Sequence, residues 1–183
     1  MVLCLTLMPH RTMEKLNAKV IIWGNDNYNV LGLLRQLTPF VEEVLFLVNQ
    51  GTEHCATWSK YCKEYVIAQT YEVGISFLIE KGKLLNNKGF VITTNDMLAE
   101  YVDLHRKELI EYYHLTGTLE SGLLTRMQGK NEMTRLASEL GFNVPWSSLF
   151  DKSSSIDHIT YPCVIKPDYH SNKYKCHFKI RCI

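Results

Sequence analysis

Four short apolar segments constrain the fold of this chain most strongly. Each is five residues long, is rich in β-branched or aromatic residues, and shows no alternation between apolar and polar positions. They are KVIIW at 19–23, VLFLV at 44–48, EYVIA at 64–68 and GFVIT at 89–93. Strands of this kind are typical of parallel sheets that are covered by helices on both faces.

The stretches between these strands carry helical patterns. Their apolar residues recur at helical spacing, and Pro39 ends the first stretch. Helices are therefore expected at 30–37, at about 71–82 and from about Met97 onward. Strands and helices that alternate over 13–113 predict an open, Rossmann-like α/β sheet. We expect 104–113 to remain helical, with a core face made by Leu104, Leu109, Ile110 and Tyr113.

Polar residues follow two of the predicted strands, at the sheet edge where such folds bind ligands. Asn25 and Asp26 come after the first strand, and we interpret them as a turn. Asn95 and Asp96 come after the fourth strand, and we interpret them as the cap of the next helix. Gly24 is followed by Asn-Asp-Asn instead of Gly-x-x-Gly, so the dinucleotide fingerprint is missing. A tight strand-to-helix turn is the preferred interpretation of Gly24.

Charge and composition exclude several classes of protein. The formal net charge is +1, which provides no basic surface for nucleic acid. No apolar run is long enough to span a membrane. Six cysteines without an export signal indicate reduced thiols in a cytoplasmic protein, and their spacing with histidine matches no zinc site. Residues 1–12 are expected to be a disordered leader, or to lie upstream of a start at Met13.

Two lysines stand out in the second part of the chain, which begins near Gly117. Lys130 precedes an amphipathic helix at 131–140, where a positive charge is unfavourable for the helix itself. Lys166 follows a short apolar strand expected at 163–165. Two lysines placed in this way can neutralise a polyphosphate from two sides.

The order of these features resembles the start of an ATP-grasp domain. The run GKNEMTRLASELGFNVPWSSLF, a polar spacer and then YPCVIKP match that family's pattern of a lysine opening a helix, Gly-x-x-x-Pro, and a strand ending in Lys-Pro. The resemblance is nearest to the carbamoyl-phosphate-synthase-like and D-aspartate-ligase-like carboxylate–amine ligases. It implies a Rossmann-like pre-ATP-grasp domain at 13–116 and the incomplete first part of an ATP-grasp domain at 117–183.

The resemblance also implies a chemistry. Lys130 and Lys166 would bind ATP, and the loop 168–175 would cover its phosphates, although this loop lacks the usual glycine. Mg²⁺ would be required, with its ligands outside this chain. A carboxylate substrate would form an acyl phosphate that a small amine then attacks.

Three functions remain open on the sequence. The leading one is the ATP-binding portion of such a ligase, which is not catalytic as this chain alone and which would require a complementing chain or a second copy. The alternative is a non-catalytic α/β module that binds a small ligand or a protein. A Rossmann-like oxidoreductase is disfavoured because the glycine fingerprint is missing.

Overall fold

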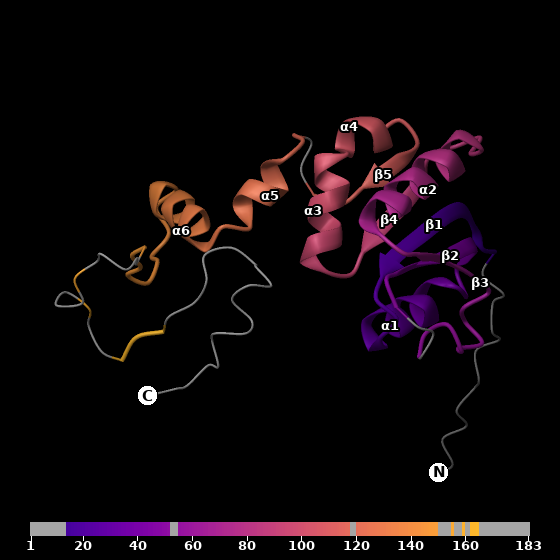
Figure 1. Cartoon of the computed structure of the whole chain (residues 1–183), viewed down its shortest axis with the longest axis horizontal. Helices are drawn as coiled ribbons and strands as arrows, with labels where there is room; N and C mark the ends of the chain where they lie inside the picture. Colours follow the sequence, from indigo (N-terminus) through magenta and orange to yellow (C-terminus); the bar gives the residue numbers. More distant parts are fainter. Residues whose placement is uncertain are drawn as a thin grey trace, which may run out of the picture. The chain divides into compact units, whose positions relative to one another are not determined.

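The computed structural model describes residues 14–51, 55–117, 120–149, 155, 159 and 162–164. The chain divides into two compact units, residues 1–117 and residues 118–183. They are called unit 1 and unit 2 in this order (Figure 1).

Unit 1 is built on a five-stranded sheet in which every pair of neighbouring strands is parallel. The strands lie in the order β3-β2-β1-β4-β5 (Figure 1). Their bounds are β1 Leu16–Gly24, β2 Val41–Asn49, β3 Glu64–Ala68, β4 Gly89–Thr93 and β5 Tyr113–Leu115. The helices of this unit are α1 Tyr28–Leu37, α2 Tyr71–Lys83, α3 Asp96–Leu104 and α4 Arg106–Leu109. The expected α/β fold with a parallel sheet is confirmed, as are all four predicted strands.

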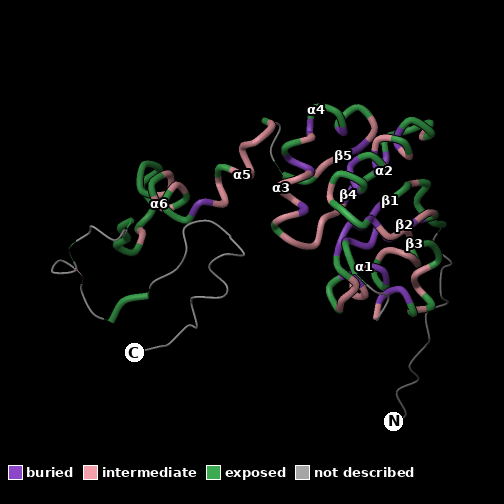
Figure 2. The backbone as a smooth tube through the Cα atoms, in the orientation of Figure 1, coloured by how far each residue is buried: buried purple, intermediate pink, exposed green. Residues whose placement is uncertain are grey.

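Both faces of β1 are buried, and each face belongs to a separate core. Ile21 and Trp23 pack with residues of α2, α3 and α4, whereas Val20 and Ile22 pack with residues of α1. Connections between parallel strands are right-handed. α1 connects β1 to β2, and α2 connects β3 to β4 in the opposite direction across the sheet, so the two helices cover opposite faces. Figure 2 shows that the buried positions of unit 1 follow these strands.

The helix expected over 104–113 is wrong in its second half. The chain leaves α3 at Leu104, makes the short α4, and then enters β5, which pairs with β4 through Tyr113 and Gly89. Leu109 and Tyr113 are buried as expected, but Leu104 is 54% exposed. The Tyr113 hydroxyl donates to the carbonyl of Leu78 in α2 at 2.8 Å, so burial against α2 favours the strand over a continued helix.

A buried ion pair joins the end of α3 to the start of α4. Asp103 is fully buried and Arg106 is 3% exposed, and the Arg106 Nε atom lies 3.2 Å from Asp103 Oδ1. The same guanidinium donates through Nη2 to the carbonyl of Thr116 at 2.6 Å. Arg106 therefore fixes the last residues of unit 1 to its helical layer.

The described part of unit 2 contains two helices, α5 Leu123–Met127 and α6 Lys130–Glu139. The predicted helix at 131–140 is confirmed, and Gly141 follows it with a φ of +82°, the left-handed geometry of a helix stop. Neither helix contains a buried residue (Figure 2). Met133 in α6 is 51% exposed, and Leu140, which directly follows α6, is 67% exposed.

The strand expected at 163–165 is not found in its described part. Cys163 and Val164 have no strand geometry, and Val164 is 74% exposed. Every described strand belongs to the sheet of unit 1, so these two residues have no described strand beside them to complete a ladder of hydrogen bonds. Ile165 and Lys166 lie outside the described residues.

Two helical glycines provide a matched test of this packing. A Cβ atom at Gly74 in α2 would lie 2.2 Å from the Trp23 ring, whereas one at Gly32 in α1 would meet nothing within 4 Å. We expect Gly74→Ala to lower the free energy of unfolding by about 1–3 kcal/mol through overpacking. Gly32→Ala should raise it by up to about 1 kcal/mol, because alanine is the better helix former. Urea unfolding of both variants checks this, and equal effects would contradict the packing described.

The buried ion pair gives a second test. Arg106→Met leaves the Asp103 carboxylate buried without its cation, which should cost about 3–5 kcal/mol of unfolding free energy. The double variant Arg106→Met/Asp103→Leu removes both charges and should recover most of that loss. Thermal unfolding of the single and double variants measures the difference. If the double variant were no more stable than the single one, the pair would not be the main contribution of Arg106.

Candidate functional site

The carboxyl ends of β1 and β4 mark the point where the strand order of unit 1 reverses. From β1 the chain continues to β2 and β3 on one side and returns to β4 on the other. Open parallel sheets bind ligands in the crevice at such a switch point. The residues that follow the strands at this edge are therefore the candidate site residues.

Three asparagines from neighbouring strands meet at this edge. Asn49 ends β2, and Asn25 and Asn95 follow β1 and β4. Asn25 Oδ1 accepts from Asn49 Nδ2 at 3.0 Å and from Asn95 Nδ2 at 3.5 Å. The Asn95 Oδ1 atom accepts from the backbone N–H of Leu98 at 3.0 Å, so its predicted role as a helix cap is confirmed. Sequence reasoning missed Asn49, because it is the last residue of an apolar strand.

Asp26 holds a loop that is distant in sequence. Its Oδ1 atom accepts from the backbone N–H groups of Cys55 and Ala56 at 3.1 and 2.5 Å. Its Oδ2 atom accepts from the Thr57 hydroxyl at 2.6 Å. Burial, and to a smaller extent the Asp26 carboxylate, raises the pKa of the Cys62 thiol. The interpretation of Asp26 as a local turn residue is therefore incomplete, since it also anchors the connection between β2 and β3.

Gly24 is required by close packing. A Cβ atom here would lie 2.1 Å from Thr94 Oγ1 and 2.8 Å from Val30 Cγ2. Its backbone is not in the left-handed region. The Thr94 side chain thus packs directly against Gly24 at the end of β1. In a dinucleotide-binding protein, the pyrophosphate would lie at this position.

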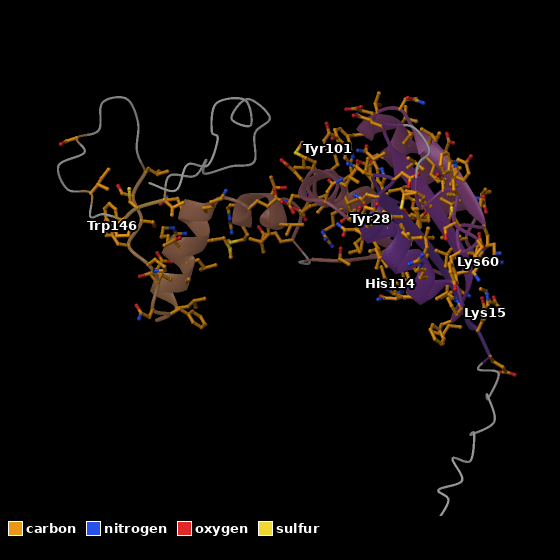
Figure 3. The ribbon with its side chains drawn as sticks, turned by 90° about the horizontal axis from the view of Figure 1, so that it is seen from below. Lys15, Tyr28, Lys60, Tyr101, His114 and Trp146 are labelled. Atoms are coloured by element: carbon orange, nitrogen blue, oxygen red, sulfur yellow. The ribbon has the colours of Figure 1, made fainter. Side chains whose placement is uncertain are left out.

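A shallow hollow of about 520 Å³ lies beside α1 and β4. Its lining contains no charged residue, and Tyr28 at its rim, labelled in Figure 3, is 83% exposed. The lining residues are Tyr28, Asn29, Gly32, Leu33, Gln36, Ile92, Thr93 and Thr94. Such a lining suits an uncharged group better than a phosphate.

Cations are missing from the described part of this edge. The residues at the strand ends, 25–27, 49–51, 69–70 and 94–95, include no lysine, arginine or histidine. Lys130 begins α6 of unit 2 and is exposed, in agreement with its expected place at a helix start. Lys166 and the loop 168–175 lie outside the described residues, so no geometry joins the two lysines.

The described residues do not form a metal site or a membrane span. No group of three histidine, cysteine, aspartate or glutamate side chains is arranged to hold a metal ion in the part of the chain that the structure describes. A Mg²⁺ ion held by the described residues would therefore need further ligands from water, substrate phosphates or other residues. Among these residues, no helix has the length and apolar character needed to cross a membrane.

Comparisons with known proteins identify the fold. No protein-family model and no curated protein matches the sequence. Among solved structures, the chain is similar to an L-amino acid ligase from Bacillus licheniformis, with a TM-score of 0.64 and 16% identity over 85% of this chain and 39% of that chain. The chain is also similar to an N5-carboxyaminoimidazole synthetase from Staphylococcus aureus, complexed with ADP, with a TM-score of 0.46 and 12% identity over 69% of this chain and 31% of that chain.

The likeness to the L-amino acid ligase supports the α/β fold with a parallel sheet. At 16% identity it shows the fold alone, and the chain spans 39% of that enzyme's length. The finer resemblance to carbamoyl-phosphate-synthase-like and D-aspartate-ligase-like enzymes stays a prediction.

The contacts of Asp26 make a local prediction. Hydrogen bonds to a charged acceptor are worth about 1.5–3 kcal/mol, so Asp26→Ala should speed amide exchange at Cys55 and Ala56 by roughly 10- to 150-fold. Asp96→Ala, at the start of α3, should leave those two amides unchanged. Hydrogen exchange followed by NMR measures both variants. Unchanged protection at Cys55 in Asp26→Ala would show that the carboxylate does not hold the loop.

Proposed function

We propose that this chain is the ATP-binding portion of an ATP-dependent carboxylate–amine ligase. The supporting observation is the fold likeness to an L-amino acid ligase over 85% of the chain. That share is about 155 of the 183 residues, whereas unit 1 ends at residue 117, so the likeness extends into unit 2.

The proposed chemistry has two steps. A carboxylate oxygen of one substrate bonds to the γ-phosphorus of ATP, and ADP leaves. The nitrogen of a small amine then bonds to the acyl carbon, and inorganic phosphate leaves. Lysines stabilise the phosphate charge in such transfers, and Mg²⁺, with ligands expected outside this chain, would supply further positive charge.

Lys130 and Lys166 are the proposed phosphate-binding residues. Lys130 is exposed at the first residue of α6, where its positive charge gives no benefit to the helix dipole. The backbone N–H groups of this helix start have no side-chain cap, so they favour an anion as well. The described carboxyl edge of unit 1 offers no competing cation, which favours unit 2 as the nucleotide-binding part.

The chain alone is proposed to bind ATP without completing the reaction. Its described residues contain no cluster of metal ligands, and the chain spans 39% of the ligase it resembles. The remaining partners would be the small carboxylate, the small amine, and a complementing chain or a second copy that supplies the metal ligands.

A non-catalytic module is the second candidate. The uncharged hollow and the asparagine cluster at the edge of unit 1 favour it, because they are made by unit 1 residues without unit 2. The two candidates differ in their ligand, since a module of this kind needs no nucleotide.

Nucleotide binding can be measured by thermal unfolding. A ligand present at one hundred times its Kd stabilises the folded state by about 2.7 kcal/mol. We expect Mg-ATP to raise the melting temperature of the full chain, and Lys130→Ala and Lys166→Ala each to abolish most of that rise.

Lys83→Ala is the matched control, because Lys83 is an exposed lysine at the end of α2 in unit 1. Its melting temperature should rise with Mg-ATP as much as that of the unsubstituted chain. An equal loss of the rise in Lys83→Ala, or no rise with Mg-ATP at all, would contradict the proposal and favour the module.

A further inference from the structure

The asparagine cluster of unit 1 is fixed by strand register. Gly24 pairs with Val48 across β1 and β2, and Trp23 pairs with Thr93 across β1 and β4. Continuing these registers to the strand ends brings Asn25 level with both Asn49 and Asn95. The three amides are thus held together by the most regular part of the fold.

The hydrogen bonds within the cluster leave one amide oxygen and one whole amide nitrogen without a partner among the described residues. A side-chain amide has one carbonyl oxygen and two N–H donors. The oxygens of Asn25 and Asn95 both accept hydrogen bonds, but Asn49 Oδ1 is buried and has no partner among the described residues. Asn25 is exposed, and its Nδ2 atom makes no hydrogen bond to a described residue.

The vacant acceptor on Asn49 is energetically expensive. Asn49 is 6% exposed, and a buried polar atom without a partner is destabilising until a donor is supplied. Two amides commonly pair reciprocally, each donating to the other. Here the bond from Asn49 to Asn25 is made and the bond from Asn25 to Asn49 is not, so the pair is open on one side.

The two unused groups select the chemistry of a ligand. A primary carboxamide offers a donor for Asn49 Oδ1 and an acceptor for Asn25 Nδ2. A carboxylate has acceptors alone, so it would leave Asn49 unpaired, and the described residues directly after the strands at this edge include no lysine, arginine or histidine to balance its charge. An ammonium group has donors alone and leaves Asn25 Nδ2 unpaired.

We propose that Asn25, Asn49 and Asn95 form a recognition site for the carboxamide group of a small ligand. The site belongs to unit 1 and does not depend on the proposed binding of ATP through Lys130 and Lys166. It fits either function proposed above, as a substrate site in a ligase or as the ligand site of a module.

The site can be tested by NMR on the full chain with ¹⁵N-labelled asparagine. Two pairs of probes differ only in carboxamide against carboxylate: L-glutamine against L-glutamate, and nicotinamide against nicotinate. At least one carboxamide should shift the side-chain signals of Asn25, Asn49 and Asn95 saturably. Its carboxylate counterpart should bind about 5- to 150-fold more weakly, the ratio that corresponds to one unpaired buried group.

Two variants and a control complete the experiment. Asn25→Asp keeps the shape but replaces the donor with an acceptor, so it should lose the preference for the carboxamide, and Asn25→Ala should lose binding. Asn87→Ala should change nothing, because Asn87 is exposed and precedes β4 at the opposite edge. The proposal is overturned if neither carboxamide gives a saturable shift, which would leave an ordinary hydration site. Equal affinity for both members of a pair, or unchanged affinity in Asn25→Asp, would overturn it as well.

Discussion

The parallel pairing of β1 with β2 on one side and β4 on the other is the constraint on which the rest of unit 1 depends. It places Trp23 in one core and Ile22 in the other, and both side chains are fully buried. Because the connections are right-handed, the helices that lead to β2 and to β4 cover opposite faces of the sheet. The same geometry creates the switch point, so the fold and the location of the candidate site have a single cause.

The proposed roles of the two units follow from where charge is available. At the edge of unit 1, Asp26 accepts hydrogen bonds from the loop at 55–57, and Gly24 leaves room for the Thr94 side chain. The remaining polar groups at this edge are amides and hydroxyls. These groups suit an uncharged ligand. Unit 2 begins its longer described helix with an exposed lysine and exposes apolar side chains along the same helix. Unit 2 is therefore better suited to bind a polyphosphate. This agrees with the resemblance of the unit 2 sequence to the start of an ATP-grasp domain.

Much of the fold was predictable because apolar β-branched runs report directly on buried parallel strands. β5 was missed because Tyr113–Leu115 is too short to show a period, and its neighbours Leu109 and Ile110 continue a helical pattern. The site was less predictable. Asn25 and Asn95 are 70 residues apart, and Asp26 reaches 31 residues along the chain to Thr57, so only the assembled sheet brings these partners together. Lys130 was placed correctly at a helix start because a helix boundary is a local feature.

Photo-crosslinking with 8-azido-ATP, followed by mass spectrometry of the labelled peptides, tests the central claim most directly. The claim is that nucleotide binds to unit 2 while the switch point of unit 1 is left to an uncharged ligand. The account predicts label within residues 118–183, suppressed by unlabelled ATP. Label on the peptide that contains Asn25, Asp26 and Asn27, competed away by ATP in the same manner, would contradict it and would make unit 1 a nucleotide-binding Rossmann-like domain.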